Sequence, residues 1–194
     1  MIEVRRTEHF MEWLGSLRDA RAVAKIAQRL QRVAEGNFGD WAPVGEGVSE
    51  LRILYGPGFG VYFVRRGNVV VVVPRRQVDA GARHRTREVA GKGTIMAIET
   101  KPFDVAEILN SEERISAYLE EAFETGDPRI IASAIGDVAR SRNPSTIARN
   151  AGLSRETIYQ AFSPEGNPTL STVTAVMKSL GFQLSVKPIE TAAG

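Results

Sequence analysis

The chain has 194 residues, a formal net charge of +2 and no cysteine. The absence of cysteine excludes disulfides and thiolate metal sites, and the overall composition is typical of an ordinary soluble protein. The longest apolar run, Val69 to Val73, is too short to cross a bilayer, and charged residues stand where a signal peptide would be apolar, so we expect a cytoplasmic protein without membrane contact.

The first half of the chain is predicted to be α+β. Apolar spacing predicts a short strand at residues 2–6 and two helices at residues 7–17 and 19–35. Three strands joined by glycine-containing turns follow, at residues 47–55, 60–65 and 68–73. We therefore expect a domain over residues 1–73 in which two helices pack on a small antiparallel sheet.

Residues 74–95 have almost no apolar periodicity. They contain five of the chain's arginines, at positions 75, 76, 83, 85 and 87, and three glycines. This composition is typical of a linker.

The second half, residues 96–194, is predicted to be all-helical apart from its end. Helices are expected at residues 104–109, 111–125, 127–142, within 143–162, and from 169 or 171 to 180. Alternation at residues 182–186 predicts a short C-terminal strand, which either pairs two chains or closes the domain internally. No spacing of side chains suggests a metal or a cofactor, so we expect neither.

Residues 143–162 have the pattern of a helix-turn-helix. Ala148 is small where a second helix would cross, Gly152 allows a left-handed turn, and Ile158 faces inward. Ser154 is placed to cap the second helix. A structural helical hairpin is the alternative, but it would not need all of these features together.

The second helix would present polar side chains to a major groove. We expect Arg155 and Gln160 to contact base edges, because Arg suits guanine and Gln suits adenine. Ser154, Thr157 and Tyr159 are expected to contact phosphates. One small helix reads few base pairs, so the sequence predicts a homodimer on a palindromic operator.

The first half resembles a HigB/RelE-type toxin of the addiction-module killer family. The resemblance rests on residues 5–10 (RRTEHF), 36–40 (GNFGD), 44–53 (VGEGVSELRI) and 55–58 (YGPG). It implies a RelE-like fold and a ribonuclease that cleaves mRNA on the ribosome through cationic side chains. Arg52 stands where the family places one of these cations, and Tyr62 lies in a second family segment.

Residues 96–188 resemble the HigA-type antidote protein of the same kind of operon. The matching segments are residues 118–122 (YLEEA), 126–128 (GDP), 135–140 (IGDVAR), 153–156 (LSRE) and 163–168 (SPEGNP). The resemblance implies a protein that blocks the toxin and represses the shared promoter. The glutamates of residues 112–124 either mimic RNA in the toxin's basic groove or form a solvated helix face.

The sequence departs from the toxin family at two places. Gly60 replaces an arginine, and residues 74–80 replace a segment that carries a lysine. One back-translation of residues 75–87, read one nucleotide later, encodes Gly-Asp-Lys-Ser-Thr-Gln-Ala-Arg-Asp-Ile-Ala-Arg, which is the expected segment. We therefore interpret residues 74–95 as derived from a frameshift that fused two overlapping genes.

The charge distribution supports two modules that contact each other. Residues 1–95 hold 16 Lys and Arg against 10 Asp and Glu, and residues 96–194 hold 9 against 13. The leading hypothesis is a repressor joined to a toxin half with impaired catalysis, in contact within one chain or between two. The alternatives are a self-inhibited ribonuclease that acts on the ribosome and mRNA, and a protein-interaction pair without a nucleic-acid role.

Overall fold

The computed structural model describes residues 2–45, 47–73, 99–163, 165–186 and 188. The chain divides into two compact units, Met1–Glu121 and Ala122–Gly194, each of which is described by itself. The expected linker at residues 74–95 lies outside the described residues.

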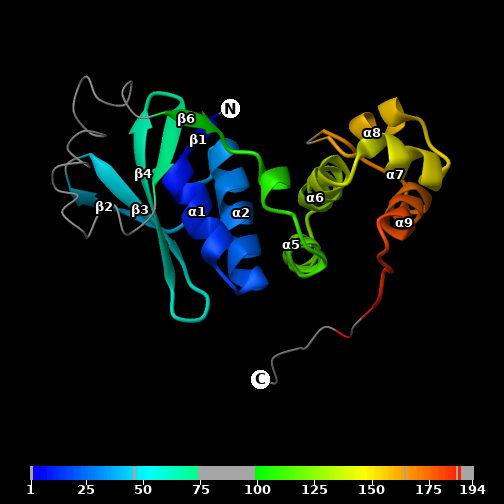
Figure 1. The fold of residues 1–194 in the computed structure, drawn as a ribbon, viewed down its shortest axis with the longest axis horizontal. Helices are drawn as coiled ribbons and strands as arrows, with labels where there is room; N and C mark the ends of the chain where they lie inside the picture. Colours follow the sequence, from blue (N-terminus) through cyan, green and yellow to red (C-terminus); the bar gives the residue numbers. More distant parts are fainter. Residues whose placement is uncertain (1, 46, 74–98, 164, 187, 189–194) are drawn as a thin grey trace. The chain divides into compact units, whose positions relative to one another are not determined.

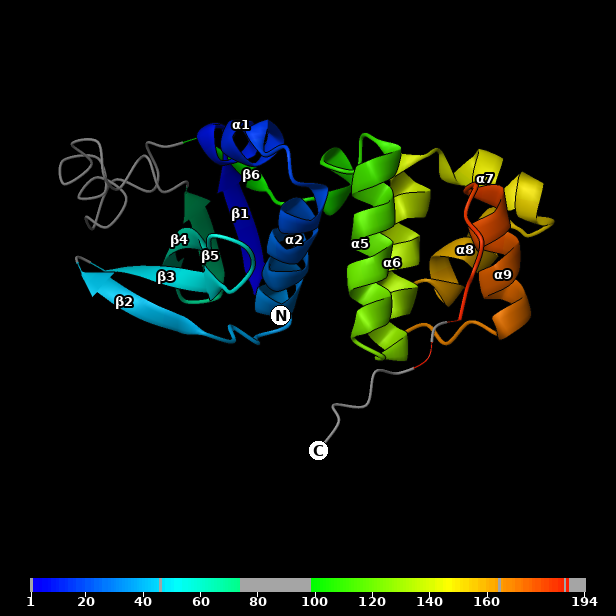
Figure 2. The same cartoon turned by 90° about the horizontal axis from the view of Figure 1, so that it is seen from below.

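The first unit is built around one sheet of six strands, in the order β2-β3-β4-β5-β1-β6 (Figures 1 and 2). The strands are β1 (Glu3–Thr7), β2 (Trp41–Gly45), β3 (Val48–Ile53), β4 (Phe59–Arg66), β5 (Val69–Val73) and β6 (Thr100–Pro102). β1 runs parallel to β5, and the other neighbours are antiparallel.

The sheet is therefore mixed, which corrects the antiparallel sheet expected from the sequence. β2, β3, β4 and β5 are neighbours in both sequence and space. β1 and β6, from distant parts of the chain, add to this sheet beside β5, with β1 between β5 and β6. A parallel pair needs a long connection, and here two helices and three strands separate β1 from β5. β2 and β6 were not predicted, because β2 contains Pro43 and β6 has only three residues.

Two helices, α1 (Glu8–Ser16) and α2 (Ala20–Ala34), lie on the same face of the sheet (Figure 1). Their starts follow from local capping: Thr7 Oγ1 accepts a hydrogen bond from Phe10 N at 3.2 Å, and Asp19 Oδ1 accepts from Arg21 N and Ala22 N. Both helices bury apolar residues at helical spacing, which are Phe10 and Leu14 of α1 and Val23, Ile26, Leu30 and Val33 of α2. These helices confirm the sequence prediction.

The first unit ends with residues 99–121, which contain β6, a short 3₁₀ helix η2 (Val105–Glu107) and most of α5 (Glu112–Glu124). This segment is separated in sequence from β5 but contributes buried residues to the same unit, namely Val105, Ile108, Leu109, Ile115, Tyr118 and Leu119. Tyr118 is the largest fully buried side chain among the described residues.

The second unit is helical, with α6 (Pro128–Ser141), α7 (Pro144–Ala151), α8 (Arg155–Ala161) and α9 (Leu170–Ser179). Pro128 opens α6 after the cap Asp127, as the sequence predicts, and of the two starts that the sequence leaves open for the last helix, Thr169 is the one that caps α9. α6 passes close to the end of α8 at Gly136, where a Cβ would meet the carbonyl oxygen of Phe162. Glycine is thus required there by packing.

The strand expected at residues 182–186 does not form. The backbone there is irregular, although Phe182 and Leu184 are half-buried and alternate with exposed residues. The alternation is real, but a strand also needs a partner edge, and the described part of the second unit contains no strand. Of the described helices, none is long and apolar enough to cross a bilayer.

Candidate nucleic-acid interface and docking contacts

Helix α7 begins at a local capping arrangement. Asn143 has a positive φ of 66°, which asparagine tolerates better than most residues, and its Oδ1 accepts hydrogen bonds from Ser145 N and Thr146 N. Pro144 occupies the first helical turn, where its missing N–H is not needed. The cap of Asn143 and the position of Pro144 therefore fix where α7 begins.

The turn between α7 and α8 is formed by Gly152, Leu153 and Ser154. Gly152 has a φ of 68°, and its N–H and that of Leu153 both donate to the end of α7, with Leu153 N at 2.9 Å from Ala148 O. Ser154 Oγ then accepts from Thr157 N at 3.0 Å and caps α8. Two short helices are joined by a turn whose backbone groups are satisfied locally.

The apolar residues of this pair pack into the second unit. Ile147, Ala148 and Ile158 are buried, and Ala151, Leu153 and Ala161 are half-buried. α7 packs against α8 and α9. The inward face predicted from the sequence is the face that the structure buries.

The polar residues proposed to contact DNA lie on the other side of α8. Arg155, Tyr159 and Gln160 are exposed, as is Ser154, and Thr157 is half-buried. The structure brings Arg155 and Tyr159 together: Arg155 Nη2 donates to Tyr159 Oη at 3.0 Å, and the guanidinium lies 5.3 Å from the ring centroid. Ser154 and Thr157 interact with each other, with 2.8 Å between their hydroxyl oxygens.

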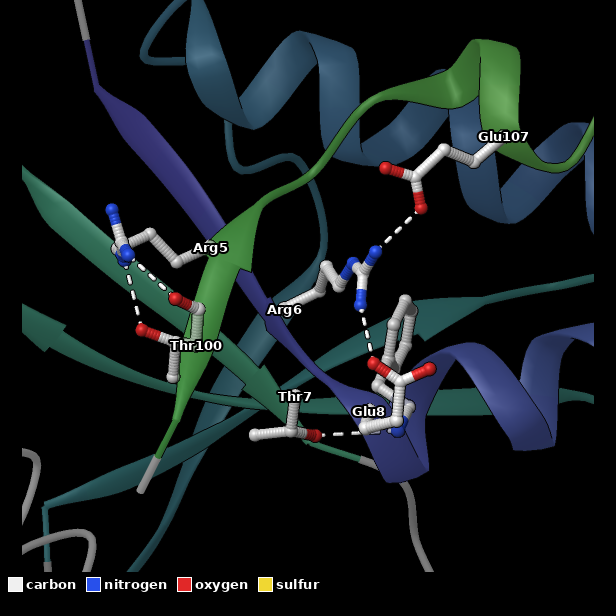
Figure 3. A network of polar contacts seen from close by, with 7 residues as sticks. Arg5, Arg6, Thr7, Glu8, Thr100 and Glu107 are labelled. Carbon is white, nitrogen blue, oxygen red and sulfur yellow. Dashed lines mark hydrogen bonds and ion pairs between the residues drawn. The ribbon is translucent and has the colours of Figure 1, made fainter. Parts of the chain in front are cut away.

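A second set of contacts ties residues 99–121 to the start of the chain. β6 pairs with β1, with Thr100 opposite Thr7, and Arg5 Nη2 donates to the carbonyl of Thr100 at 2.6 Å. The side chain of Arg6 is buried between two carboxylates, Glu8 at 2.9 Å and Glu107 at 2.5 Å (Figure 3). β6 thereby covers the edge of the sheet that β1 would otherwise leave unpaired.

Helix α5 continues these contacts along α1 and α2. Arg114 Nη2 donates to the carbonyls of Gly15 and Leu17, where α1 ends and the negative end of its dipole lies. Tyr118 Oη donates to Gln31 Oε1 at 2.6 Å. Sequence analysis missed these residues individually, because the charge difference between the halves indicated an attraction but not its partners.

The residues proposed for catalysis lie on neighbouring strands. Arg52 on β3 is directly opposite Gly60 on β4, and Glu50 is opposite Tyr62, so the four residues share one face of the sheet. Arg52 is exposed and lies 3.8 Å from Glu50, whereas Tyr62 is buried beside Val48, Val64 and Val73. A Cβ at position 60 would meet Glu50 Oε1. The end of the flexible Glu50 side chain would therefore have to shift to admit an arginine at position 60.

Among the described residues, no group of three or more His, Cys, Asp or Glu side chains is placed to hold a metal ion.

Comparison with known proteins gives matches to part of the chain. A family model described as probable addiction module antidote protein matches residues 99–188. One Haemophilus influenzae protein is 52% identical over 92 residues, which cover 47% of this chain and 95% of the relative. A second protein from that organism is 42% identical over 72 residues, or 37% of this chain and 73% of the relative. Both relatives are described as uncharacterized proteins, and no solved structure matches significantly.

Proposed function

Since the chain belongs, through residues 99–188, to the family of probable addiction module antidote proteins, we propose that it is a toxin–antitoxin module fused in one chain. In this proposal residues 1–73 are a HigB/RelE-like toxin domain and residues 96–194 are a HigA-like antitoxin. The antitoxin part neutralises the toxin part and represses its own promoter. In this proposal the function needs no cofactor and takes place in the cytoplasm.

The observation that carries neutralisation is the position of residues 99–121. The family match begins at residue 99, yet these residues belong to the first compact unit, together with the sheet and α1 and α2. β6 extends the sheet by strand addition, and α5 contributes the buried Tyr118. An antitoxin segment that completes the toxin's sheet would remain bound as long as the first unit is folded.

Neutralisation is tested by supplying the two parts separately. We expect residues 96–194 with a purification tag to retain co-expressed residues 1–95. The tether is then absent, so retention measures the contacts alone. A pair that shows no retention, while both pieces remain soluble, would contradict the proposed neutralisation.

For DNA binding, the proposal rests on α7 and α8. Ile147, Ala148 and Ile158 are buried while Arg155 and Gln160 are exposed on one helix, which is the arrangement that a helix-turn-helix needs to enter a major groove. We propose that Arg155 and Gln160 read base edges and that Ser154, Thr157 and Tyr159 contact phosphates of operator DNA. A homodimer would double the few base pairs that each helix can read.

The test of repression is a footprint of the full chain on its upstream DNA. Arg155→Ala should weaken specific binding by about 1–3 kcal/mol, because a bidentate contact to guanine is lost. Arg149→Ala on α7, which also removes an exposed cation from the same unit, is the control for charge alone. An equal loss in both variants would contradict the assignment of Arg155, and the absence of any footprint would contradict the function.

The second candidate function is a self-inhibited mRNA ribonuclease, which the exposure of Arg52 favours. We propose that its catalysis is impaired, because Gly60 supplies no cation and Glu50 lies beside it. Losing one charge-stabilising group lowers the rate about a hundred- to a thousandfold. Expression of residues 1–95 should therefore leave growth unaffected. Growth arrest that Arg52→Ala abolishes would favour the ribonuclease instead, with the ribosome and mRNA as partners.

A further inference from the structure

A cavity of about 330 Å³ in the second unit lies between α6 and α8. Its lining includes Gly136, Asp137 and Arg140 of α6, Ile158 and Tyr159 of α8, and Phe162 where α8 ends. Sites for small molecules typically have volumes of about 300–1,000 Å³, apolar and aromatic walls, and a few polar groups that orient the ligand. The cavity therefore has the size and the kind of lining that a small organic ligand requires.

The apolar wall of the cavity follows from the close approach of α6 to the end of α8. Gly136 permits this approach, because a Cβ at that position would meet the carbonyl oxygen of Phe162. Ile158 and Phe162 are buried, so their side chains withdraw from water on this side. The wall suits the apolar body of a ligand.

The cavity also contains a deeply buried carboxylate. The side chain of Asp137 is 3% exposed, and its Oδ1 accepts a hydrogen bond from Arg140 Nη2 at 2.6 Å. The side chain of Arg140 is 44% exposed, so its guanidinium can turn towards water, whereas the carboxylate stays where α6 places it. Asp137 is thus the fixed member of the pair, and Arg140 is the member that another cation can replace.

Aromatic residues in the same lining also favour a cation. Tyr159 and Phe162 both belong to it, and the face of an aromatic ring attracts positive charge. The ring of Tyr159 already shows this preference, since the guanidinium of Arg155 lies 5.3 Å from its centroid. An anionic ligand would instead be repelled by the buried carboxylate of Asp137.

We propose that this cavity binds a small organic cation, namely a primary amine attached to an aromatic ring, and that its ammonium group replaces Arg140 beside Asp137. An ammonium group donates the charge-assisted hydrogen bonds that a carboxylate accepts. Because one cation is exchanged for another, the buried carboxylate keeps an opposite charge throughout. The aromatic ring of the ligand would pack on the apolar wall formed by Ile158 and Phe162.

The alternative is an ion pair between Asp137 and Arg140 that only stabilises α6, three residues apart on one helix. The two cases differ in how the cavity treats ligands of the same shape and different charge. A cation site prefers an amine to a neutral or an anionic analogue. An apolar gap beside a structural ion pair has no such preference.

The experiment titrates the full chain with 2-phenylethylamine, with the neutral analogue 2-phenylethanol and with the anionic analogue 3-phenylpropionate. Amide NMR shifts of Gly136 and Ser163, two lining residues, report binding at this cavity. We expect the amine to bind with a Kd of about 1 mM, as is typical of a fragment, and the two analogues to bind about tenfold more weakly.

Two variants locate the cation. Asp137→Asn should remove the advantage of the amine, and its amide spectrum shows whether the chain is folded. Arg140→Gln removes the internal competitor and should raise the affinity for the amine about fivefold. Arg142→Gln is the matched control, because Arg142 is also an exposed cation at the end of α6 but lies outside the cavity lining.

The proposal would be overturned by equal affinities for the three probes, by the absence of shifts at Gly136 and Ser163, or by a preference for the amine that survives Asp137→Asn. Equal effects of Arg140→Gln and Arg142→Gln would also overturn it. The probe series and Arg140→Gln decide the question even where Asp137→Asn does not fold.

A ligand in this cavity should affect the exposed face of α8, and this step rests on the proposed function. Tyr159 belongs both to the cavity lining and to the residues proposed to contact phosphates of operator DNA. A bound amine adds a positive charge and releases Arg140 from Asp137 in the same lining, which favours a polyanion. We expect saturating 2-phenylethylamine to raise operator affinity about threefold and 2-phenylethanol to leave it unchanged.

The two tests fail separately. A failed operator footprint with amine binding at the cavity would reject the DNA-binding part of the proposed function alone. A normal footprint without amine binding would reject the cavity and leave that function standing. Amine binding and a normal footprint, with no change in operator affinity, would overturn the link between them.

Discussion

The segment of residues 99–121 and the helix pair α7–α8 use their polar side chains in opposite ways. In residues 99–121 three polar residues have partners far away in sequence, since Arg5 bonds Thr100, Arg6 bonds Glu107 and Lys25 bonds Glu121. In α7–α8 the partners are near neighbours: Asn143 bonds residues 145 and 146, Ser154 bonds Thr157, and Arg155 bonds Tyr159.

Residues 99–121 are thus already in contact with the rest of their unit, whereas the exposed face of α8 is available to an outside partner. Thr100, Glu107 and Glu121 are bonded to residues near the start of their own unit, and breaking those bonds disturbs the fold. Arg155, Tyr159 and Gln160 of α8 are exposed, and the contact between Arg155 and Tyr159 is local, so an outside partner can engage these side chains without unfolding the unit. Changes in the first region should affect stability, and changes in the second should affect binding.

The strongest way to break this comparison is to remove one tyrosine from each region. Tyr118→Ala should lower the free energy of unfolding of the first unit by about 3–5 kcal/mol, because a fully buried ring is lost along with its bond to Gln31. Tyr159→Ala, on exposed α8, should change stability by no more than about 0.5 kcal/mol.

Urea titration measures both effects. Trp13 and Trp41, the two tryptophans of the chain, belong to the first unit, so their fluorescence follows its unfolding, and circular dichroism follows the helices of both units. If Tyr118→Ala cost no more stability than Tyr159→Ala, residues 99–121 could not be packed as described.

A smaller effect is expected from the charged contact between β1 and η2. Arg6→Met replaces the buried cation with an unbranched apolar side chain and leaves Glu107 without its cation, and it should lower the free energy of unfolding by about 1–3 kcal/mol. Glu8 and Glu107 retain access to water, which limits the loss. Arg129→Met, at an exposed pair with 3.5 Å between Arg129 and Asp127, serves as the control and should have almost no effect.

A double-mutant cycle with Glu107→Gln would assign the Arg6 effect to this pair. The cycle should show a coupling between Arg6 and Glu107 that Arg129 and Glu107 lack. Additive changes at Arg6 and Glu107 would mean that the contact does not tie η2 to β1.

The contrast between local and long-range partners also decides how well each region could be predicted from the sequence. The cap Ser154 and the turn at Gly152 act within a few residues, so the helix pair within residues 143–162 and the start of its second helix could be predicted, and the start of α9 could be narrowed to Thr169 or Ser171. β6 has three residues and becomes a strand only because β1 lies beside it, and no local pattern reports that neighbour. The reverse holds at Phe182 and Leu184, where alternation is present but no strand pairs with it.

The candidate sites divide in a similar way. Arg155 and Gln160 could be placed on an exposed helix face from periodicity alone. The ion pair of Lys25 with Glu121 could be predicted only in part, because the sequence left the glutamates of residues 112–124 open between contact with the cations of the first half and a solvated helix face, and it did not name Lys25 as a partner. Gly60 was recognised as a departure from a family pattern, but only the register of β3 and β4 shows that Glu50 lies beside it.

Local capping should be worth less than the long-range contacts. Ser154→Ala removes the acceptor for Thr157 N and should lower the stability of the second unit by about 0.5–2 kcal/mol. Ser171→Ala is the matched control, because Thr169 and not Ser171 caps α9. The loss of helical circular dichroism during thermal unfolding gives both values. Similar losses in the two variants would show that the Ser154 cap contributes nothing of its own.

The smallest expected effects come from two carboxylates with local hydrogen bonds, Glu113 at the start of α5 and Asp127 before α6. A hydrogen bond from Arg129 N lowers the pKa of Asp127 below its ordinary value of 3.8, and a bond from the N–H of Glu113 itself lowers the pKa of Glu113 below 4.5. In each case the unfolded chain binds the proton more tightly. The stabilisation is therefore present above the unfolded pKa and is lost as the pH falls through the folded pKa.

Asp127→Asn and Glu113→Gln keep a hydrogen-bond acceptor but cannot titrate, so each should flatten the fall of stability in acid without changing it much near neutrality. Urea titrations from about pH 2 to pH 6 measure that slope. Because both bonds are local, Glu113→Gln should act as weakly as Asp127→Asn, even though Glu113 lies in residues 99–121. A much larger acid effect at Glu113 would mean that its carboxylate also holds α5 to distant residues. The loss of stability would then depend on the segment in which a residue lies, and not on whether its contacts are local or long-range.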